Sequence, residues 1–355
     1  MATAENLLVN KILNLAAERR ATDIHLTAGS YPVLRIDGKL ITLTSEQVLT
    51  PDFISGMAES FLSAADQKRL EQERDVVTVY DWASRARFRA KVFYQKGFLA
   101  ISLRLIPQII PSIKDLGLPP IVQELAGKDK GLLIITGPFG SGRTTTVTSI
   151  IETLNHSRGV HIQTLEKPIE YLLANNQAVI EQREIGKDSS SFVKGLEEML
   201  EADVDVAVVH GLMEEGQEEL ILQLAEAGKL VILIMDAISV ISALERFISN
   251  LDPNRRDWGQ DTLSQVLVGV VSQRLLPRIA GGQILAYEVL TMTPAVRSTI
   301  QSDRLPQLNN IMQTSKDEGM INMDKTLQNL VNLGEINPAD AKEQMIDSST
   351  LERSY

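Results

Sequence analysis

Gly131-Leu-Leu-Ile-Ile-Thr-Gly-Pro-Phe-Gly-Ser-Gly-Arg-Thr-Thr-Thr146 is the stretch that decides how this chain folds. The apolar run at 132–135 predicts a short buried strand. A glycine-rich turn follows from Gly137 to Gly142, and the residues after it predict a helix. A strand, a glycine-rich loop and a helix in this order are typical of the phosphate-binding loop, whose pattern is G-x-x-x-x-G-K-[ST].

In such a loop the glycines let backbone N–H groups converge on phosphate oxygens, and the following helix adds a favourable dipole. Thr144 stands where the pattern offers a hydroxyl to Mg²⁺. The alternative is an ordinary tight turn in which glycine supplies only conformational freedom. We favour nucleotide binding, and the residues expected to contact the nucleotide are Gly137, Gly140, Ser141, Gly142, Arg143, Thr144 and Thr145.

Arg143 stands where the pattern has lysine. It keeps the positive charge, but a planar guanidinium does not replace the compact ammonium of lysine. Phosphoryl transfer depends almost entirely on positioning and charge. The substitution therefore predicts that phosphate affinity survives better than catalytic geometry does.

The composition narrows the class of protein. The chain has 355 residues, enough for two or three domains, and it contains no cysteine, which favours a reducing cytoplasm. Its net charge of −11 disfavours nucleic acid as the main partner. The four histidines show no metal-ligand spacing, and neither a signal peptide nor a transmembrane segment is visible.

Four regions follow from the order of the patterns. Residues 1–106 predict a small α+β domain, with helices at 5–19 and 53–62, and a proline-rich linker follows at 107–130. Short apolar runs alternate with helical segments over 131–290, which predicts a parallel sheet covered by helices on both faces. Beyond residue 240 the pattern is mainly helical, including a helix expected at 263–274, and residues 291–355 form a helical carboxyl-terminal region.

Motifs spread over nearly the whole chain resemble those of the hexameric motor ATPases of type II secretion and type IV pili, and among these the PilT-like retraction motors. The motifs that carry the resemblance are Ala21-Thr-Asp-Ile-His-Leu-Thr-Ala-Gly29, Ala86-Arg-Phe-Arg89, Leu103-Arg-Leu-Ile-Pro107, the acidic box Gln163-Thr-Leu-Glu-Lys-Pro-Ile-Glu170, Glu181-Gln-Arg-Glu-Ile-Gly186 and Met292-Thr-Pro-Ala-Val-Arg297. As an ordered set these motifs are more specific than the phosphate loop alone.

The resemblance implies an α/β protein with a PAS-like amino-terminal domain, a RecA-like P-loop core and a helical carboxyl-terminal region. It implies ATP and Mg²⁺ as ligands, and a hexamer of this chain alone or mixed with an active paralogue. Arg87, Arg89 and Arg104 are the residues that would reach phosphate from the amino-terminal domain. The family works in the cytoplasm at the inner membrane, where ATP hydrolysis acts on pilins through a platform protein.

The departures from the family pattern fall on its chemistry. Lys167 replaces the aspartate of the acidic box, and His210-Gly211 stand where the family has Gly-Glu. The arginine expected shortly afterwards is Met213, and two histidines of the family are replaced by Lys229 and Asp236.

Glu166 is the best remaining candidate for a catalytic residue. Glu214 is the candidate for an acid relocated from position 211, but we expect Glu214, Glu215, Glu218 and Glu219 to form a solvated helix face or first turn. The sequence thus predicts a nucleotide-binding subunit for twitching motility or secretion, with weak or absent ATP hydrolysis and a regulatory role. The alternatives are an active retraction motor that uses Glu166 with a relocated acid, and a scaffold without nucleotide.

Overall fold

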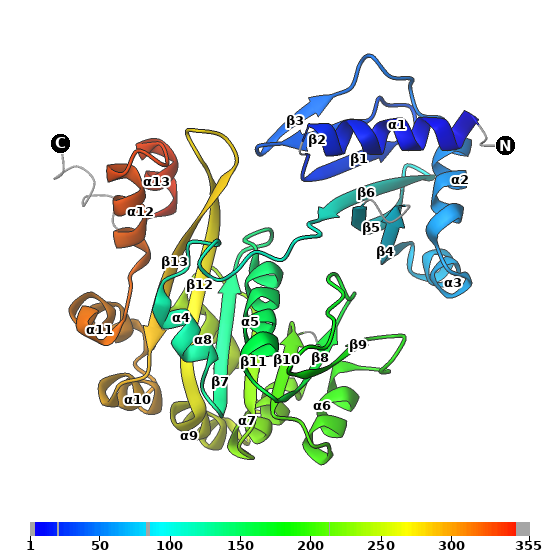
Figure 1. Ribbon diagram of the computed structural model, residues 1–355. Helices are drawn as coiled ribbons and strands as arrows, with labels where there is room; N and C mark the ends of the chain where they lie inside the picture. Colours follow the sequence, from blue (N-terminus) through cyan, green and yellow to red (C-terminus); the bar gives the residue numbers. More distant parts are fainter. Residues whose placement is uncertain (1–3, 20, 83–85, 213, 346–355) are drawn as a thin grey trace. The chain divides into compact units, whose positions relative to one another are not determined.

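The computed structural model describes residues 4–19, 21–82, 86–212 and 214–345 (Figure 1). The chain forms two compact units. Unit 1 comprises Met1–Ile109 together with Pro168–Leu172, and unit 2 comprises Ile110–Lys167 and Leu173–Tyr355. A short segment from the second half of the chain therefore belongs to the amino-terminal unit.

Unit 1 is built on a six-stranded antiparallel sheet with the order β3-β2-β1-β6-β5-β4. Its strands are β1 (Asp23–Thr27), β2 (Val33–Ile36), β3 (Lys39–Thr42), β4 (Asp75–Trp82), β5 (Ala86–Gln95) and β6 (Phe98–Ile106). Its helices are α1 (Ala4–Glu18), α2 (Pro51–Phe61) and α3 (Ala64–Glu73). This arrangement confirms the predicted α+β character, although helix α3 was not predicted from the sequence.

Unit 2 is built on a seven-stranded sheet with the order β13-β12-β7-β11-β10-β8-β9, in which only β13 runs antiparallel. Its strands are β7 (Gly131–Gly137), β8 (His161–Glu166), β9 (Val179–Glu184), β10 (Val206–His210), β11 (Leu230–Asp236), β12 (Leu267–Pro277) and β13 (Gln283–Thr291). The helices packed around them are α4 (Pro120–Ala126), α5 (Arg143–Ser157), α6 (Phe192–Glu201), α7 (Gln217–Glu226), α8 (Val240–Asn250) and α9 (Arg256–Val266). The carboxyl-terminal helices are α10 (Pro294–Gln301), α11 (Leu308–Thr314), α12 (Met323–Asn332) and α13 (Pro338–Gln344).

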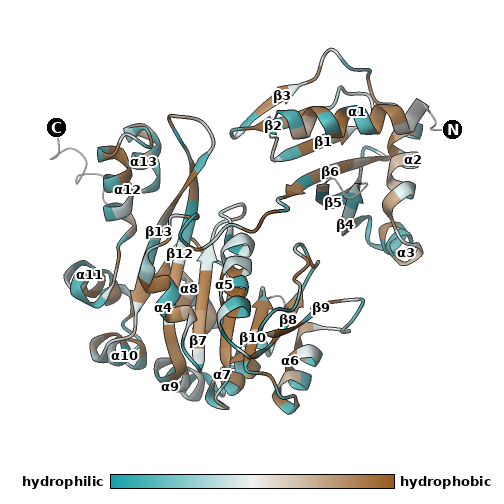
Figure 2. Ribbon diagram, in the orientation of Figure 1, coloured by the Kyte–Doolittle hydropathy of each residue, from teal (hydrophilic) through white to brown (hydrophobic). Residues whose placement is uncertain are grey.

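Strand β7 is buried on both faces, as its apolar run predicts. Leu132 and Ile134 pack into the cluster that contains α6 to α9, whereas Leu133 and Ile135 pack into the cluster that contains α4 and α5. Figure 2 shows the central strands in the brown of apolar residues, while the surrounding helices carry teal polar residues. Burial on both faces is the reason that these strands read as continuous apolar runs rather than as alternating ones.

The prediction of a helix at 263–274 is wrong. Helix α9 ends at Val266, and the residues from Leu267 onward form β12 between β7 and β13. Val270 and Val271 point to opposite faces of the sheet and are both fully buried. A strand buried in this way has no polar face, so hydrophobic periodicity does not separate it from a buried helix.

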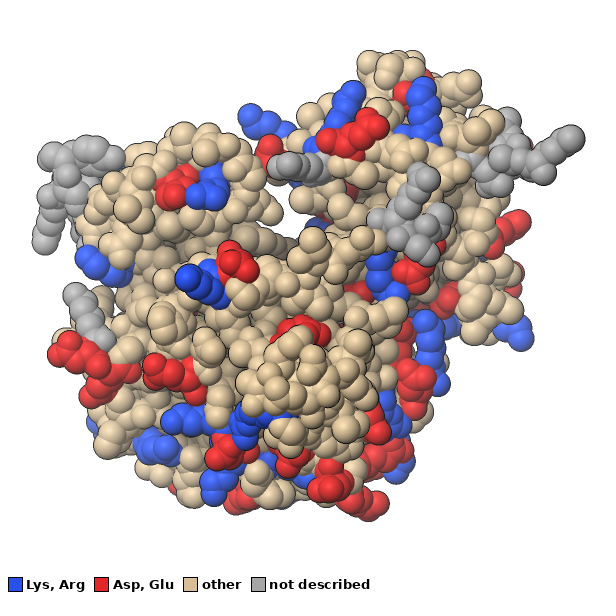
Figure 3. Space-filling view, viewed as in Figure 1, with Lys and Arg blue, Asp and Glu red and all other residues tan. Residues whose placement is uncertain are grey.

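The charged side chains on the face shown in Figure 3 are of mixed sign, with Lys and Arg interspersed among Asp and Glu. This face therefore carries no extended surface of a single charge sign. In the described part of the chain, no helix has the length and apolar character needed to cross a membrane.

Candidate functional site

The glycine-rich loop joins the carboxyl end of β7 to the start of α5. Gly140 and Gly142 have φ angles of +81° and +86°, which side-chain-bearing residues rarely adopt. A Cβ atom on Gly137 would lie 2.3 Å from the carbonyl oxygen of Gln273 and 2.4 Å from Ser141 Oγ. Glycine is therefore required at 137 by close packing and at 140 and 142 by backbone conformation.

Gln273 of β12 is hydrogen-bonded to the backbone of the loop. Its Nε2 donates to the carbonyl oxygen of Ser141 at 2.7 Å, and its side chain is fully buried. Because 263–274 was predicted to be helical, the sequence analysis missed this residue. Gln273 could have been found only from the pairing of β12 with β7. This pairing brings position 273 to the same edge of the sheet as Gly137.

The loop fits a phosphate group. Helix α5 has 15 residues and begins without a capping side chain, so the N–H groups of its first turn point toward the loop. Ser141 Oγ is buried and has no hydrogen-bond partner in the described structure. Thr144 and Thr145 lie on the first turn of α5 and are partly exposed. An oxyanion would supply the acceptor that Ser141 Oγ lacks in the described structure.

The Arg143 guanidinium already binds two acceptors within the protein. Its Nη2 lies 2.5 Å from Asp236 Oδ1, and its Nη1 donates to the carbonyl oxygen of Met235 at 2.6 Å. Met235 and Asp236 end strand β11, which pairs directly with β7. The cation of the phosphate loop is thus bound to the end of the neighbouring strand, a pairing that the sequence analysis did not foresee.

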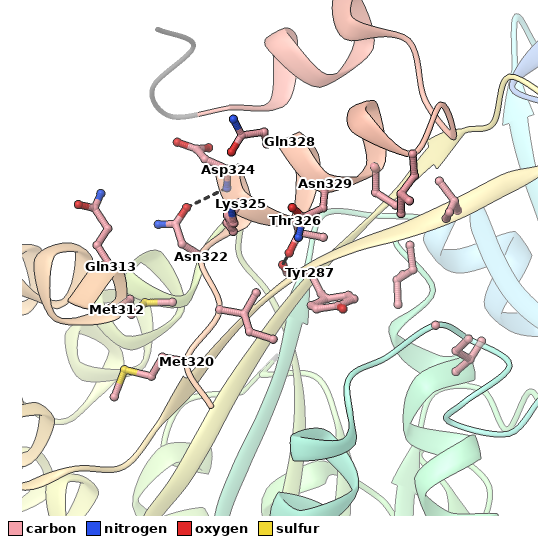
Figure 4. A pocket seen from close by; sticks show the side chains of 17 residues that line it. Tyr287, Met312, Gln313, Met320, Asn322, Asp324, Lys325, Thr326, Gln328 and Asn329 are labelled. Atoms are coloured by element: carbon pink, nitrogen blue, oxygen red, sulfur yellow. Dashed lines mark hydrogen bonds between the residues drawn. The ribbon is translucent and has the colours of Figure 1, made fainter. Parts of the chain in front are cut away.

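Apart from the glycine-rich loop, a cavity lies among the carboxyl-terminal helices (Figure 4). It has a volume of about 760 Å³ and is lined by β13, α11 and α12, with Tyr287, Met312 and Met320 among its apolar residues. Its charged lining residues are Asp324 and Lys325, one of each sign. The first turn of α12 lines this cavity and is capped by the Asn322 side chain, whereas no side chain caps α5, so the loop is the better phosphate site.

The comparisons with known proteins agree with this fold and loop. A family model described as "Type II/IV secretion system protein" matches residues 2–282. The chain belongs to this family.

Relatives within the type II/IV secretion system protein family cover nearly the whole chain. The type IV pilus retraction ATPase PilT of Pseudomonas aeruginosa is 28% identical over 95% of this chain and 97% of its own length. The type IV pilus ATPase PilU of the same organism is 29% identical, over 93% of this chain and 87% of its own length. A crystal structure of the pilus retraction motor PilT with bound ADP has a TM-score of 0.83 and 38% identity, and covers 97% of this chain and 98% of that one. Together with the two sheets, these matches confirm the PAS-like, RecA-like and helical architecture expected from the sequence.

Glu166, the candidate catalytic residue of this family member, ends β8 and is only 4% exposed. Its Oε1 accepts hydrogen bonds from Thr164 Oγ1 at 2.7 Å and from Gln182 Nε2 at 2.9 Å. Its Oε2 lies 3.8 Å from Nδ1 of His210, the last residue of β10. The sequence analysis noted His210 only as a departure, but the pairing of β8 with β10 makes it the neighbour of Glu166.

The arginines expected to reach phosphate from the amino-terminal domain all have partners inside unit 1. The contacts are Arg87 with Asp81 at 3.0 Å and with the Ile169 carbonyl at 3.1 Å, Arg89 with Glu170 at 2.9 Å, and Arg104 with Asp23 at 2.8 Å. Two of these contacts involve the Pro168–Leu172 segment, which follows Glu166 closely in the chain. A role for these arginines at phosphate stays a prediction.

The remaining departures from the family pattern, at positions 167, 213 and 229, lie in separate parts of the chain. Lys167 is exposed, and Met213 lies outside the described residues. Lys229 precedes β11 and donates to the carbonyl oxygens of Ala202 at 2.9 Å and Val204 at 3.0 Å. Because Asp236 ends the same strand, Lys229 is at the opposite edge of the sheet from the phosphate loop. Its charge supports the end of α6 rather than the phosphate site.

Gly211 has a φ angle of +113°. A glutamate in this conformation would be strained, because L side chains avoid it. The backbone after β10 is therefore shaped for glycine, and a single Gly211→Glu substitution does not rebuild the acid of the family pattern.

The expectation that Glu214, Glu215, Glu218 and Glu219 are solvated is partly wrong. Glu214 accepts hydrogen bonds from the backbone N–H groups of Phe192 at 3.1 Å and Val193 at 3.0 Å, so it caps α6. Glu218 and Glu219 are buried, with exposed fractions of 2% and 7%. Glu215 alone is exposed as expected. The burial follows from packing of α7 against the end of α8, where Asn250 Nδ2 donates to Glu218 Oε1 at 2.8 Å.

Glu218→Gln is expected to stabilise the protein at neutral pH. Burial raises the pKa of the Glu218 carboxyl above its usual 4.5, because the ionised form loses hydration. The contribution of this carboxyl to stability is thus greatest below pH 4.5 and is lost as the pH rises through the elevated pKa. We expect a Tm increase of about 2–4 °C at pH 7.5, equivalent to about 1 kcal/mol, and little increase at pH 4. Thermal melts across this pH range test it, with Glu215→Gln as the exposed control; an equal gain at both pH values would contradict it.

Proposed function

We propose that this chain is a PilT-like, nucleotide-binding subunit of a type IV pilus or related secretion system, with weak or absent ATP hydrolysis and an accessory or regulatory role. The relatives named above are pilus ATPases, and one solved PilT structure holds ADP. Nucleotide binding here is supported by the start of α5, which no side chain caps, in the loop formed by Gly137, Gly140, Ser141, Gly142, Thr144 and Thr145.

The observation that carries weak hydrolysis is the engagement of Arg143 by Asp236 and the Met235 carbonyl. A cation that neutralises a protein carboxylate has less charge to offer to developing charge on a phosphate, and removing one preorganised donor typically costs about 10²–10³ in rate. The two positions that could supply a second acid for hydrolysis beside Glu166 do not do so, because position 211 is glycine and Glu214 caps α6.

The proposed ligands are ATP and Mg²⁺. Thr144 is the residue proposed to meet the metal ion, and the described residues contain no cluster of three or more acidic or histidine side chains suited to a metal. Binding of Mg²⁺ is therefore proposed to depend on the phosphates and to be weaker than in an active motor.

By analogy with its family, the chain is proposed to act in a ring, as a homo-hexamer or as a mixed hexamer with an active paralogue. The ring would lie in the cytoplasm against an inner-membrane platform protein. A mixed ring gives a subunit with weak hydrolysis a function, because it can alter the activity of its neighbours while binding nucleotide itself.

Phosphate release from ATP by the purified protein tests the proposal, alongside binding of a fluorescent ATP analogue with and without Mg²⁺. We expect nucleotide binding with turnover that is barely above background. Glu166→Gln should leave this low rate nearly unchanged and should not weaken binding.

Brisk turnover that collapses in Glu166→Gln would identify an active motor and would contradict the proposal. A protein that bound no adenine nucleotide would instead be the scaffold named as an alternative in the sequence analysis.

A further inference from the structure

The contact between Arg143 and Asp236 has a consequence for which nucleotide the site prefers. The Arg143 side chain is 13% exposed and that of Asp236 is 62% exposed, so the carboxylate reaches the arginine from the solvent side. Among the described ion pairs, Arg143 is the one cation bound to this carboxylate. A single anionic side chain thus covers the accessible side of the loop's cation.

The position of Asp236 places this negative charge beside the phosphate loop. Strands β7 and β11 are parallel neighbours, and Asp236 is the register partner of Gly137, the first glycine of the loop. In the phosphate-loop pattern the amides hold the α- and β-phosphates, while the basic residue reaches the β- and γ-phosphates. The carboxylate therefore binds the group that a terminal phosphate would need.

We propose that this site selects nucleoside diphosphates over triphosphates, because the Asp236 carboxylate takes the place of a γ-phosphate on Arg143. The inference rests on the proposed function, in that it requires the loop to bind nucleotide. A diphosphate binds to the loop amides and leaves the Arg143–Asp236 pair intact. A triphosphate either displaces the carboxylate or lies against it, and both cost free energy.

Two further arginines lie near Asp236, but both bind backbone carbonyls rather than its carboxylate. Arg246 Nη1 donates to the backbone carbonyl of Asp236 at 2.7 Å. Arg274 Nη2 donates to the carbonyl of Ile238 at 2.9 Å, and its Nη1 contacts Gln344 of α13. These arginines fix the backbone after β11 and leave the neutralisation of the side chain to Arg143.

Isothermal titration calorimetry with ADP and with ATP, in Mg²⁺ and in EDTA, tests the selection. We expect the wild-type protein to bind ADP about tenfold more tightly than ATP, the effect of one like charge a few ångströms away in a water-accessible site. Asp236→Asn should abolish most of this preference by raising the affinity for ATP. Asp203→Asn is the matched control, because Asp203 is exposed and precedes β10 at the opposite edge of the sheet.

Each outcome bears on a different claim. Wild-type binding of ATP as tight as, or tighter than, that of ADP would overturn the selection and leave nucleotide binding in place. A preference for ADP that persists in Asp236→Asn would overturn the role of the carboxylate. Failure of the wild-type protein to bind either nucleotide would contradict the proposed function itself. Thermal melts of both variants establish that the fold is retained.

Discussion

Gly137→Ala is expected to abolish nucleotide binding and to lower the stability of unit 2. The added methyl group would lie 2.3 Å from the Gln273 carbonyl and 2.4 Å from Ser141 Oγ. The carbonyl belongs to β12, which is hydrogen-bonded to a strand on each side, so the loop is expected to move instead. Overpacking of this kind costs about 3 kcal/mol, or a Tm decrease of about 6–12 °C.

Gly159→Ala is the matched control for this substitution. The nearest atom to a Cβ at Gly159 is the Gln177 carbonyl oxygen at 4.0 Å, an ordinary contact. Tm and ADP affinity should both stay near the wild-type values in this variant. Normal nucleotide binding in Gly137→Ala would show that the loop does not hold the phosphates.

Arg143→Ala is expected to lower the affinity for ADP by roughly tenfold, because the net charge beside the phosphates becomes negative although the loop amides still bind the diphosphate. The substitution removes the cation and also leaves the Asp236 carboxylate unneutralised beside the phosphates. The double variant Arg143→Ala/Asp236→Asn should therefore bind ADP more tightly than Arg143→Ala alone. Calorimetric titration of the three proteins measures both effects.

Arg158→Ala controls for the loss of an arginine from the same helix. Arg158 follows the last turn of α5 and pairs with Asp129 at 2.5 Å, far along the helix from the loop. Its replacement should leave ADP affinity unchanged. An Arg143→Ala protein that bound ADP as tightly as the wild type would show that the unneutralised Asp236 carboxylate does not act on the bound diphosphate.

The sequence was sufficient to predict the elements whose patterns are local. The apolar run at 132–135 and the glycines after it predict β7 and the start of α5, because strand burial and turn conformation depend on neighbouring residues. The Asp37-Gly38 turn of the β2–β3 hairpin, with both φ angles positive, is another local signal. Leu267 to Pro277 lacked such a signal, because a strand buried on both faces and a buried helix are equally apolar.

The arrangement of the candidate site depended on contacts between distant residues. Arg143 and Asp236 were each noted as departures, but only the pairing of β7 with β11 shows that they neutralise one another. Lys229 was grouped with them by its position in a motif, whereas the structure puts it at the other edge of the sheet. Burial of Glu218 likewise follows from α8, which no pattern within α7 reports.

The Pro168–Leu172 segment gives the amino-terminal unit a part that its own stretch of sequence does not encode. The chain enters unit 2 after Ile109, returns to unit 1 for these residues, and then leaves it again. A fragment that ends at Ile109 would lack the Ile169 carbonyl that accepts from Arg87 and the Glu170 carboxylate that pairs with Arg89. The boundary visible in the sequence is therefore not the boundary of the amino-terminal unit, because a fragment cut there carries the sheet of unit 1 without the segment that completes it.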